Sequence, residues 1–182
     1  RPVEVKRDWG ISDQTLCPGY ASIKFAKTVI DEVISLFPSA WIHIGGDEVP
    51  TKRWQKNPAV QHLQRKLGAS NVDDIKDWFI NELGQHLSSR GRTLIGWDEI
   101  TEAMLSQKQS KQDRPPIGKW NKGSAIMWWR AKHAQIAVDA VRAGIDVVVA
   151  VSSFLYFDFY QGPKSTEPLA IGGLTALEKV YK

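Results

Sequence analysis

The sequence predicts an α/β fold in which helices join parallel strands. Three observations predict this class. Short apolar runs of strand length alternate with amphipathic segments of helix length, glycine or proline follows the helical segments, and acidic residues follow two of the strand-like runs. The 182 residues, 42% of them hydrophobic, are enough to bury the core of one domain.

The chain opens with an irregular stretch and then a helix. Residues 1–20 have no clean period, so we expect an irregular lead-in. After them, apolar residues recur every four positions, which indicates an amphipathic helix with Ser22 as its N-cap and Pro38 just beyond its end. The expected apolar face consists of Phe25, Val29, Val33 and Phe37.

Two strands and two more helices are predicted between residues 41 and 97. The apolar runs 41–45 and 93–97 indicate buried strands. Asn57 and Pro58 begin a helix that ends at Gly68. Asn71 caps the next helix, which Gly91 closes. The apolar face of that helix consists of Val72, Ile75, Phe79, Leu83 and Leu87.

The second half repeats the alternation after an interruption. Residues 106–123 are rich in Lys, Gln, Ser and Pro, so we predict an exposed excursion. Residues 124–129 form the third predicted strand, residues 132–143 a helix that Gly144 ends, and residues 146–151 the fourth strand. This order demands parallel strands with right-handed crossovers.

Polar and aromatic residues gather where the predicted strands end. The ends of successive strands carry Asp47 and Glu48, then Trp97 with Asp98 and Glu99, then Trp129, and then Tyr156 and Asp158. This is the layout of a (β/α)₈ barrel active site. The rival doubly wound nucleotide fold would need a glycine-rich phosphate loop, and none opens these helices. We therefore predict part of a (β/α)₈ TIM barrel.

Each residue of this group also has a purely structural interpretation. Adjacent acids such as Asp47 and Glu48 often form a solvated loop, a tyrosine can anchor a loop, and an aspartate can cap a turn. Asp98 and Glu99 fit substrate contacts and helix caps equally well. A lone strand tryptophan is commonly a core residue, and neighbouring strand residues face opposite ways, so only one of residues 128 and 129 can line a site.

Composition and motifs exclude several classes of function. The net charge of +4 comes from scattered basic residues without a nucleic-acid motif, so we expect no nucleic-acid partner. No apolar run approaches the roughly 20 residues that span a bilayer. Cys17, the one cysteine, is expected to be inert. His, Cys and carboxylates do not occur at metal-ligand spacing, so we predict no metal or cofactor.

Residues 43–48, His-Ile-Gly-Gly-Asp-Glu, resemble the His-x-Gly-Gly-Asp-Glu signature of family 20 glycoside hydrolases, the β-N-acetylhexosaminidases. The resemblance continues through 96–99, 129–130 and 156–162 in the family's order. It implies that residues 1–182 are a fragment of a single catalytic (β/α)₈ domain, about strands 4 to 7 with their helices. The family's earlier strands and its final strand have no counterpart in this sequence.

The resemblance also implies a function. Family members remove terminal β-linked N-acetylglucosamine or N-acetylgalactosamine with retention, and the substrate's own 2-acetamido oxygen attacks the anomeric carbon. Expected substrates are N-acetylhexosamine-terminated glycans or chitooligosaccharides, and the implied compartment is secreted, periplasmic or lysosomal. The match assigns catalysis to Asp47, Glu48 and Tyr156, and substrate binding to Trp97, Trp129, Asp158 and His43.

Two other functions stay open at this point. One is a retaining glycosidase with two carboxylates, in which Glu48 is the acid and Asp158 or Glu99 the nucleophile. The other is a non-catalytic, carbohydrate-binding half barrel. An open half barrel leaves strand edges unpaired, so we expect the isolated segment to be weakly active or inactive, and two copies to pair as a homodimer through these edges.

Overall fold

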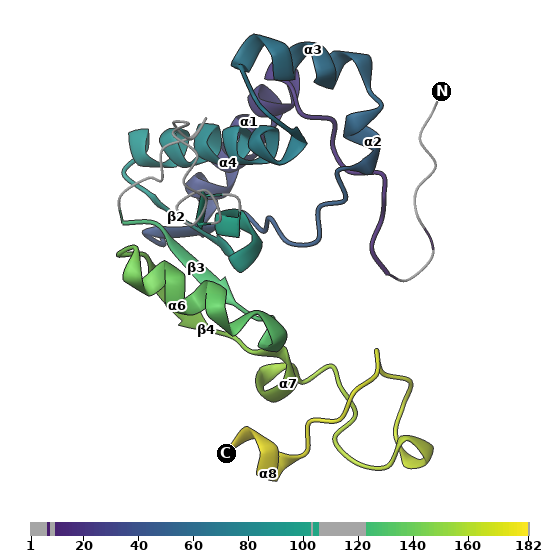
Figure 1. Cartoon of the computed structure of the whole chain (residues 1–182). Coiled ribbons are helices and arrows are strands. Elements are labelled where there is room, and N and C mark those ends of the chain that lie inside the picture. Colours follow the sequence, from purple (N-terminus) through teal and green to yellow (C-terminus); the bar gives the residue numbers. More distant parts are fainter. Residues whose placement is uncertain (1–6, 8–9, 103, 106–122, 182) are drawn as a thin grey trace.

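A computed structural model describes residues 7, 10–102, 104–105 and 123–181. Four strands form one parallel sheet in the order β1-β2-β3-β4 (Figure 1). The strands are β1 (Trp41–His43), β2 (Thr93–Trp97), β3 (Ala125–Trp128) and β4 (Asp146–Val149). This topology confirms the predicted α/β class. The predicted excursion at 106–123 lies outside the described residues, apart from residue 123.

One helix precedes the sheet, and others connect its strands. Helix α1 (Tyr20–Leu36) packs against α4 (Val72–Ser89), α4 packs on β2, and α6 (Ala134–Arg142) packs on β4. The other helices and turns named in the described ranges are α2 (Lys52–Gln55), α3 (Pro58–Leu67), η1 (Asp98–Thr101), η2 (Ala131–His133), α7 (Ser152–Leu155), η3 (Lys164–Thr166) and α8 (Leu177–Val180). Among the helices of the described ranges, none combines the length and apolarity needed to cross a membrane.

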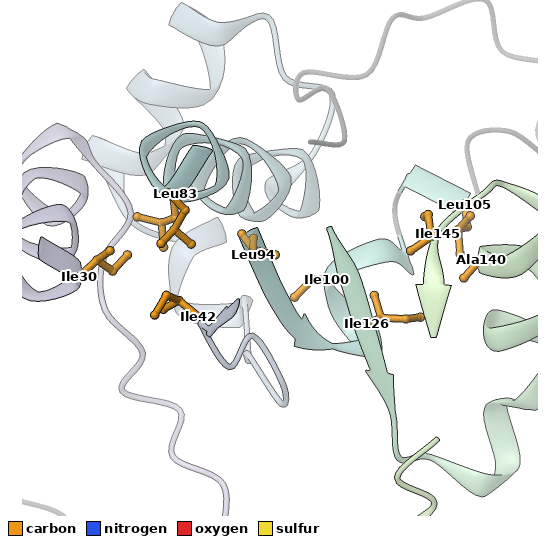
Figure 2. Close-up of a cluster of buried hydrophobic side chains, with 10 residues drawn as sticks. Ile30, Ile42, Leu83, Leu94, Ile100, Leu105, Ile126, Ala140 and Ile145 are labelled. Carbon is orange, nitrogen blue, oxygen red and sulfur yellow. The ribbon is translucent and has the colours of Figure 1, made fainter. Parts of the chain in front are cut away.

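The two faces of the sheet differ in burial. Figure 2 shows Ile42, Leu94 and Ile126, one from each of the first three strands, in a buried cluster that includes residues of α1, α4 and α6. Along β1 and β2, every second residue is buried. The residues between them, which include His43 and Trp97, are exposed or half-buried. The core therefore lies between sheet and helices, and the other face of the sheet is open.

Local capping fixes the helices that precede β2. The Asn71 side chain accepts the backbone N–H groups of Asp73 and Asp74, both at 2.9 Å, and the Asp74 carboxylate accepts the N–H of Asn71 at 3.3 Å. This reciprocal pair is a capping box. Asn57 caps α3 through a single bond, in which its side chain accepts the N–H of Ala59 at 2.9 Å. These caps confirm the predicted starts of α3 and α4.

The predicted N-cap of the first helix was wrong. The N-cap is Gly19, and α1 begins at Tyr20. Ser22 lies inside the first turn, where its hydroxyl donates to the carbonyl oxygen of Cys17 at 2.5 Å. Serine readily bonds nearby backbone groups, so it satisfies a carbonyl upstream of the helix instead of capping an N–H.

The predicted apolar face of α1 was wrong in part: Val33 packs against the buried cluster, but Phe25, Val29 and Phe37 are exposed. The buried residues are Ile23 and Ile30, whereas Phe25 and Phe37 are 63% and 59% exposed. Apolar residues occur around most of this helix, so periodicity alone does not select the face that packs. Contact with α4 and the sheet selects the isoleucines. In α4, by contrast, Val72, Ile75, Leu83 and Leu87 are buried as predicted.

The predicted strands extend beyond the regular sheet at several ends. The N–H of Ile44 still donates to the carbonyl of Ile95 at 3.0 Å, and the N–H of Ala150 to that of Trp128 at 2.8 Å. These single bonds continue the ladder past the ends of β1 and β4. The predicted helix at 132–143 is split, because the turn η2 precedes α6. Within the described part of the lead-in, residues 10–19 form no helix or strand.

Candidate active site

Four aromatic rings form a continuous row beyond the carboxyl ends of the strands. The rings of His43 and Trp97 lie 5.1 Å apart at 69°, and those of Trp97 and Trp129 lie 6.4 Å apart at 71°. Trp129 then stacks on Tyr156 with 6.1 Å between centroids and 12° between planes. We call these four residues the aromatic row. Parallel pairing brings together predicted site residues from four separate segments.

An acid loop, residues 45–48, turns sharply after β1. Gly45, Gly46 and Glu48 have φ angles of 72°, 94° and 48°, all in the left-handed region. For glutamate this conformation is strained, at a cost of about 1–3 kcal/mol, and such strain concentrates at functional sites. Two hydrogen bonds hold the loop: the N–H of Gly45 donates to His43 Nδ1 at 3.0 Å, and the N–H of Trp97 donates to the Gly45 carbonyl at 2.9 Å.

Close packing against β2 and η1 explains two glycines of this region. A Cβ on Gly96 would lie 2.9 Å from the Gly45 carbonyl oxygen, so only glycine lets the acid loop approach β2 this closely. A Cβ on Gly46 would collide with Cγ2 of Ile100, which is buried. The loop that carries the two acids is thus seated directly on the end of the second strand.

Asp47 lies within electrostatic reach of the aromatic row. Burial raises the pKa of the Tyr156 hydroxyl, and the charge of Asp47 raises it further. Burial also lowers the pKa of His43, against the opposing effect of the Asp47 charge. Tyr156 is therefore a protonated donor at neutral pH. Because His43 Nδ1 accepts a hydrogen bond, the neutral imidazole carries its proton on Nε2.

Glu48 is the last residue of the acid loop. Its side chain is exposed, and in the part of the chain that the structure describes its carboxylate forms no hydrogen bond or ion pair. Asp47 therefore acts on the rings through its charge, and the exposed Glu48 carboxylate is accessible to groups that approach from solvent.

Tyr156 and Asp158 reach the site by a route that the sequence did not predict. Tyr156 follows the one-turn helix α7, and residues 157–158 form a turn. Asp158 is exposed, and its charge adds to the rise in the pKa of Tyr156. A turn, and not an extended strand, therefore brings Tyr156 and Asp158 close together.

Asp98 and Glu99 are neither helix caps nor exposed ligands. Asp98 is fully buried and accepts the backbone N–H of Trp129 at 3.2 Å and Nε of Arg130 at 2.7 Å. Glu99 accepts the indole Nε1–H of Trp129 at 3.0 Å, and Nη2 of Arg130 lies 2.7 Å from Glu102. The sequence carried a signal for this cluster, since acids and an arginine follow adjacent predicted strands, but the pairing itself was missed.

The structure also contains an apolar cavity of about 240 Å³ on the helix side of the acid loop. Its lining consists of Thr15, Leu16, Ile44, Gly46, Val49, Trp54, Lys76, Phe79, Ile80 and Leu83. It includes none of the aromatic row and is almost entirely apolar, so it is not the surface that the site residues share. No group of three or more His, Cys, Asp or Glu side chains is arranged for a metal ion in the described ranges.

Comparison with known proteins decides the family. Residues 1–182 match the family model "Glycosyl hydrolase family 20, catalytic domain". The chain belongs to glycosyl hydrolase family 20. It is 37% identical over 175 residues to a beta-hexosaminidase of Porphyromonas gingivalis, with 95% of this chain and 20% of that protein covered. It is 31% identical over 173 residues to a beta-hexosaminidase of Vibrio furnissii, with 94% and 26% covered.

Solved structures of this family share the fold. A family 20 exo-β-N-acetylglucosaminidase from Vibrio harveyi aligns with a TM-score of 0.70 at 28% identity, covering 89% of this chain and 23% of that one. Flavobacterium johnsoniae chitobiase aligns with a TM-score of 0.68 at 26% identity, covering 97% and 28%. The predicted partial (β/α)₈ barrel is thereby confirmed, and the chain spans 20% to 28% of the length of these four relatives.

The packing of the acid loop makes a stability prediction. Gly46→Ala should destabilise the fold by about 2–4 kcal/mol, because the new methyl group meets buried Ile100 and φ is unfavourable. Gly68→Ala is the matched control, since Gly68 also has a positive φ but open space around its Cβ position. It should cost about 1 kcal/mol. Urea unfolding measures both; equal losses would contradict the close contact.

Proposed function

We propose that this chain carries the acid/base and the 2-acetamido-binding groups of a retaining β-N-acetylhexosaminidase. Its substrates would be glycans or chitooligosaccharides that end in N-acetylglucosamine or N-acetylgalactosamine. The names of the relatives support this class, and the Vibrio harveyi structure is a complex with N-acetylglucosamine. The observation that carries the proposal is the convergence of Asp47 and Tyr156 beside Trp129. Because the chain spans about a fifth of its Porphyromonas gingivalis relative, activity itself is part of the proposal.

Glu48 acts as the general acid and then as the general base. Its exposed carboxyl at the rim can reach the glycosidic oxygen of a bound sugar and protonate it as the aglycone leaves. The same carboxylate then takes a proton from the water that opens the intermediate. Proton transfer of this kind contributes ~10²- to 10⁴-fold.

Asp47 and Tyr156 act on the acetamido group. Adjacent residues of one loop cannot easily flank a sugar ring on opposite faces, so Asp47 is poorly placed as a displacing nucleophile. In the substrate-assisted route Asp47 accepts the acetamido N–H, and the protonated Tyr156 donates to the acetamido oxygen. The Asp47 carboxylate also stabilises the positive charge of the oxazolinium-like intermediate, which is a transition-state effect.

The remaining residues of the site bind and orient the sugar. Trp97 and Trp129 offer apolar ring surface to the acetamido methyl group and the sugar face. Asp158, exposed beside Tyr156, accepts a hydrogen bond from a sugar hydroxyl. His43 packs on Trp97 and anchors the Gly45 N–H, so it orients the loop that carries Asp47.

In the two-carboxylate alternative, the structure disfavours one of the two candidate nucleophiles. Glu99 is only 7% exposed and is engaged by Trp129, so it is poorly placed to attack a sugar. Asp158 is exposed and keeps that alternative open. Substrate choice separates the mechanisms, since rapid cleavage of an aryl glucoside without a 2-acetamido group requires a protein nucleophile. The partly exposed aromatic row favours the non-catalytic alternative, and a measurement of turnover distinguishes it from an enzyme.

Activity is best tested in a complete barrel. We suggest grafting residues 10–181 in place of the matching segment of the Porphyromonas gingivalis relative. The graft should hydrolyse a chromogenic N-acetylglucosaminide, and Glu48→Gln should lower kcat by ~10²- to 10⁴-fold while sugar binding survives. Glu32→Gln, on the exposed surface of α1, is the matched control. The 182-residue chain alone should show little or no turnover.

Two results would contradict the proposal. Unchanged kcat in the Glu48→Gln graft would remove the assigned acid. A folded graft that binds the sugar but never hydrolyses it would favour the carbohydrate-binding alternative.

We also propose that two copies of the chain associate through their open edges. In the sheet of the described residues, β1 and β4 each pair on one side only. Trp41, Val148 and Val149 of these edge strands are 42%, 44% and 59% exposed. Two such sheets have the eight strands of a closed barrel. Light scattering at high protein concentration should give the dimer mass, and a monomer mass would contradict this association.

A further inference from the structure

We infer that Glu99 is a positioning residue that fixes the plane of the Trp129 indole against Tyr156. The inference rests on the proposed function, because the aromatic row matters for catalysis only if a sugar binds there. Glu99 acts through Trp129 and has no assigned contact with the substrate.

Two neighbouring acids hold the same tryptophan at two points. Asp98 Oδ1 accepts the backbone N–H of Trp129 at 3.2 Å, and Glu99 Oε2 accepts its indole Nε1–H at 3.0 Å. The first bond fixes the main chain beyond β3, and the second fixes the rotation of the ring about its side-chain torsions. The indole therefore cannot turn without breaking a hydrogen bond to a buried carboxylate.

Glu99 is itself held in place. It is 7% exposed, its Oε1 lies 3.6 Å from Nε of Arg130, and its backbone carbonyl accepts Nζ of Lys76 at 3.1 Å. Arg130 is fixed in turn by the fully buried Asp98, with 2.6 Å between Nη2 and Oδ2. Arg130 thus restricts the carboxylate of Glu99 and Lys76 restricts its backbone, as expected of a group that orients another side chain.

The orientation of Trp129 affects its neighbours in the aromatic row. Trp129 is edge-on to Trp97 at 6.4 Å and near-parallel to Tyr156 at 6.1 Å. Because Glu99 occupies its indole N–H, Trp129 offers a ligand only ring surface. Rotation of this ring would move the surface on which Tyr156 stacks, and with it the hydroxyl that the proposed mechanism uses.

A spectroscopic test applies to the chain as it stands, whether or not it is active. The chain has eight tryptophans, and Trp129→Phe identifies the indole N–H signal of Trp129 in a ¹⁵N spectrum. Glu99→Ala should shift that signal and speed its hydrogen exchange by at least about tenfold. Glu99→Gln should restore protection, because the amide keeps an acceptor oxygen. Glu102→Ala, which removes an acid from Arg130 but not from Trp129, is the matched control.

An indole signal that Glu99→Ala leaves unchanged would overturn the inference, as would a Glu102→Ala variant with the same effect. The kinetic arm uses the grafted barrel. Glu99→Ala should lower kcat/KM by about ten- to a hundredfold, with most of the loss recovered in Glu99→Gln. In a Trp129→Phe background, Glu99→Ala should have no further effect, and additive losses would contradict action through Trp129.

The two proposals fail differently. If the parent graft does not hydrolyse the N-acetylglucosaminide, the proposed function fails, and the indole measurement still decides whether Glu99 holds Trp129. If the graft is active, and the Glu99→Ala variant has the same Trp129 indole signal and the same kcat/KM as its parent, only the positioning role fails.

Discussion

Parallel pairing of four consecutive strands is the constraint on which this site depends. It aligns four strand ends at one edge, so that rings from distant parts of the sequence meet in a single row. The pairing is close at one point in particular, where Gly96 lets the Gly45 carbonyl approach β2. Asp47 and Glu48 are presented at the rim because the loop before them is seated on the neighbouring strand.

A buried charge cluster links the next pair of strand ends. Asp98 and Glu99 follow β2, Arg130 follows β3, and their contacts enclose the main chain and indole of Trp129. Burying Asp98 completely is tolerable only with such partners, since an unpaired buried carboxylate costs several kcal/mol. The cluster therefore has a geometric role, because it holds an aromatic side chain in one orientation between Trp97 and Tyr156.

Sequence patterns predicted the parts of this structure that local chemistry determines. The caps Asn57 and Asn71, the order of strands and helices, and the family signature at 43–48 are local signals, and the fold follows them. Patterns were less informative where several faces were equally apolar, as in α1, whose buried side depends on contact with α4. The hydrogen bonds of Glu99 and the turn after Tyr156 depend on tertiary contacts, which spacing alone does not encode.

The central claim is that Asp47 and Tyr156 together stabilise a charged, cyclised acetamido group. A thiazoline derivative of N-acetylglucosamine mimics that intermediate, so its inhibition constant on the grafted barrel tests the claim directly. The account predicts that the thiazoline binds at least ~10²-fold more tightly than N-acetylglucosamine itself. Equal affinity for the two compounds would contradict it.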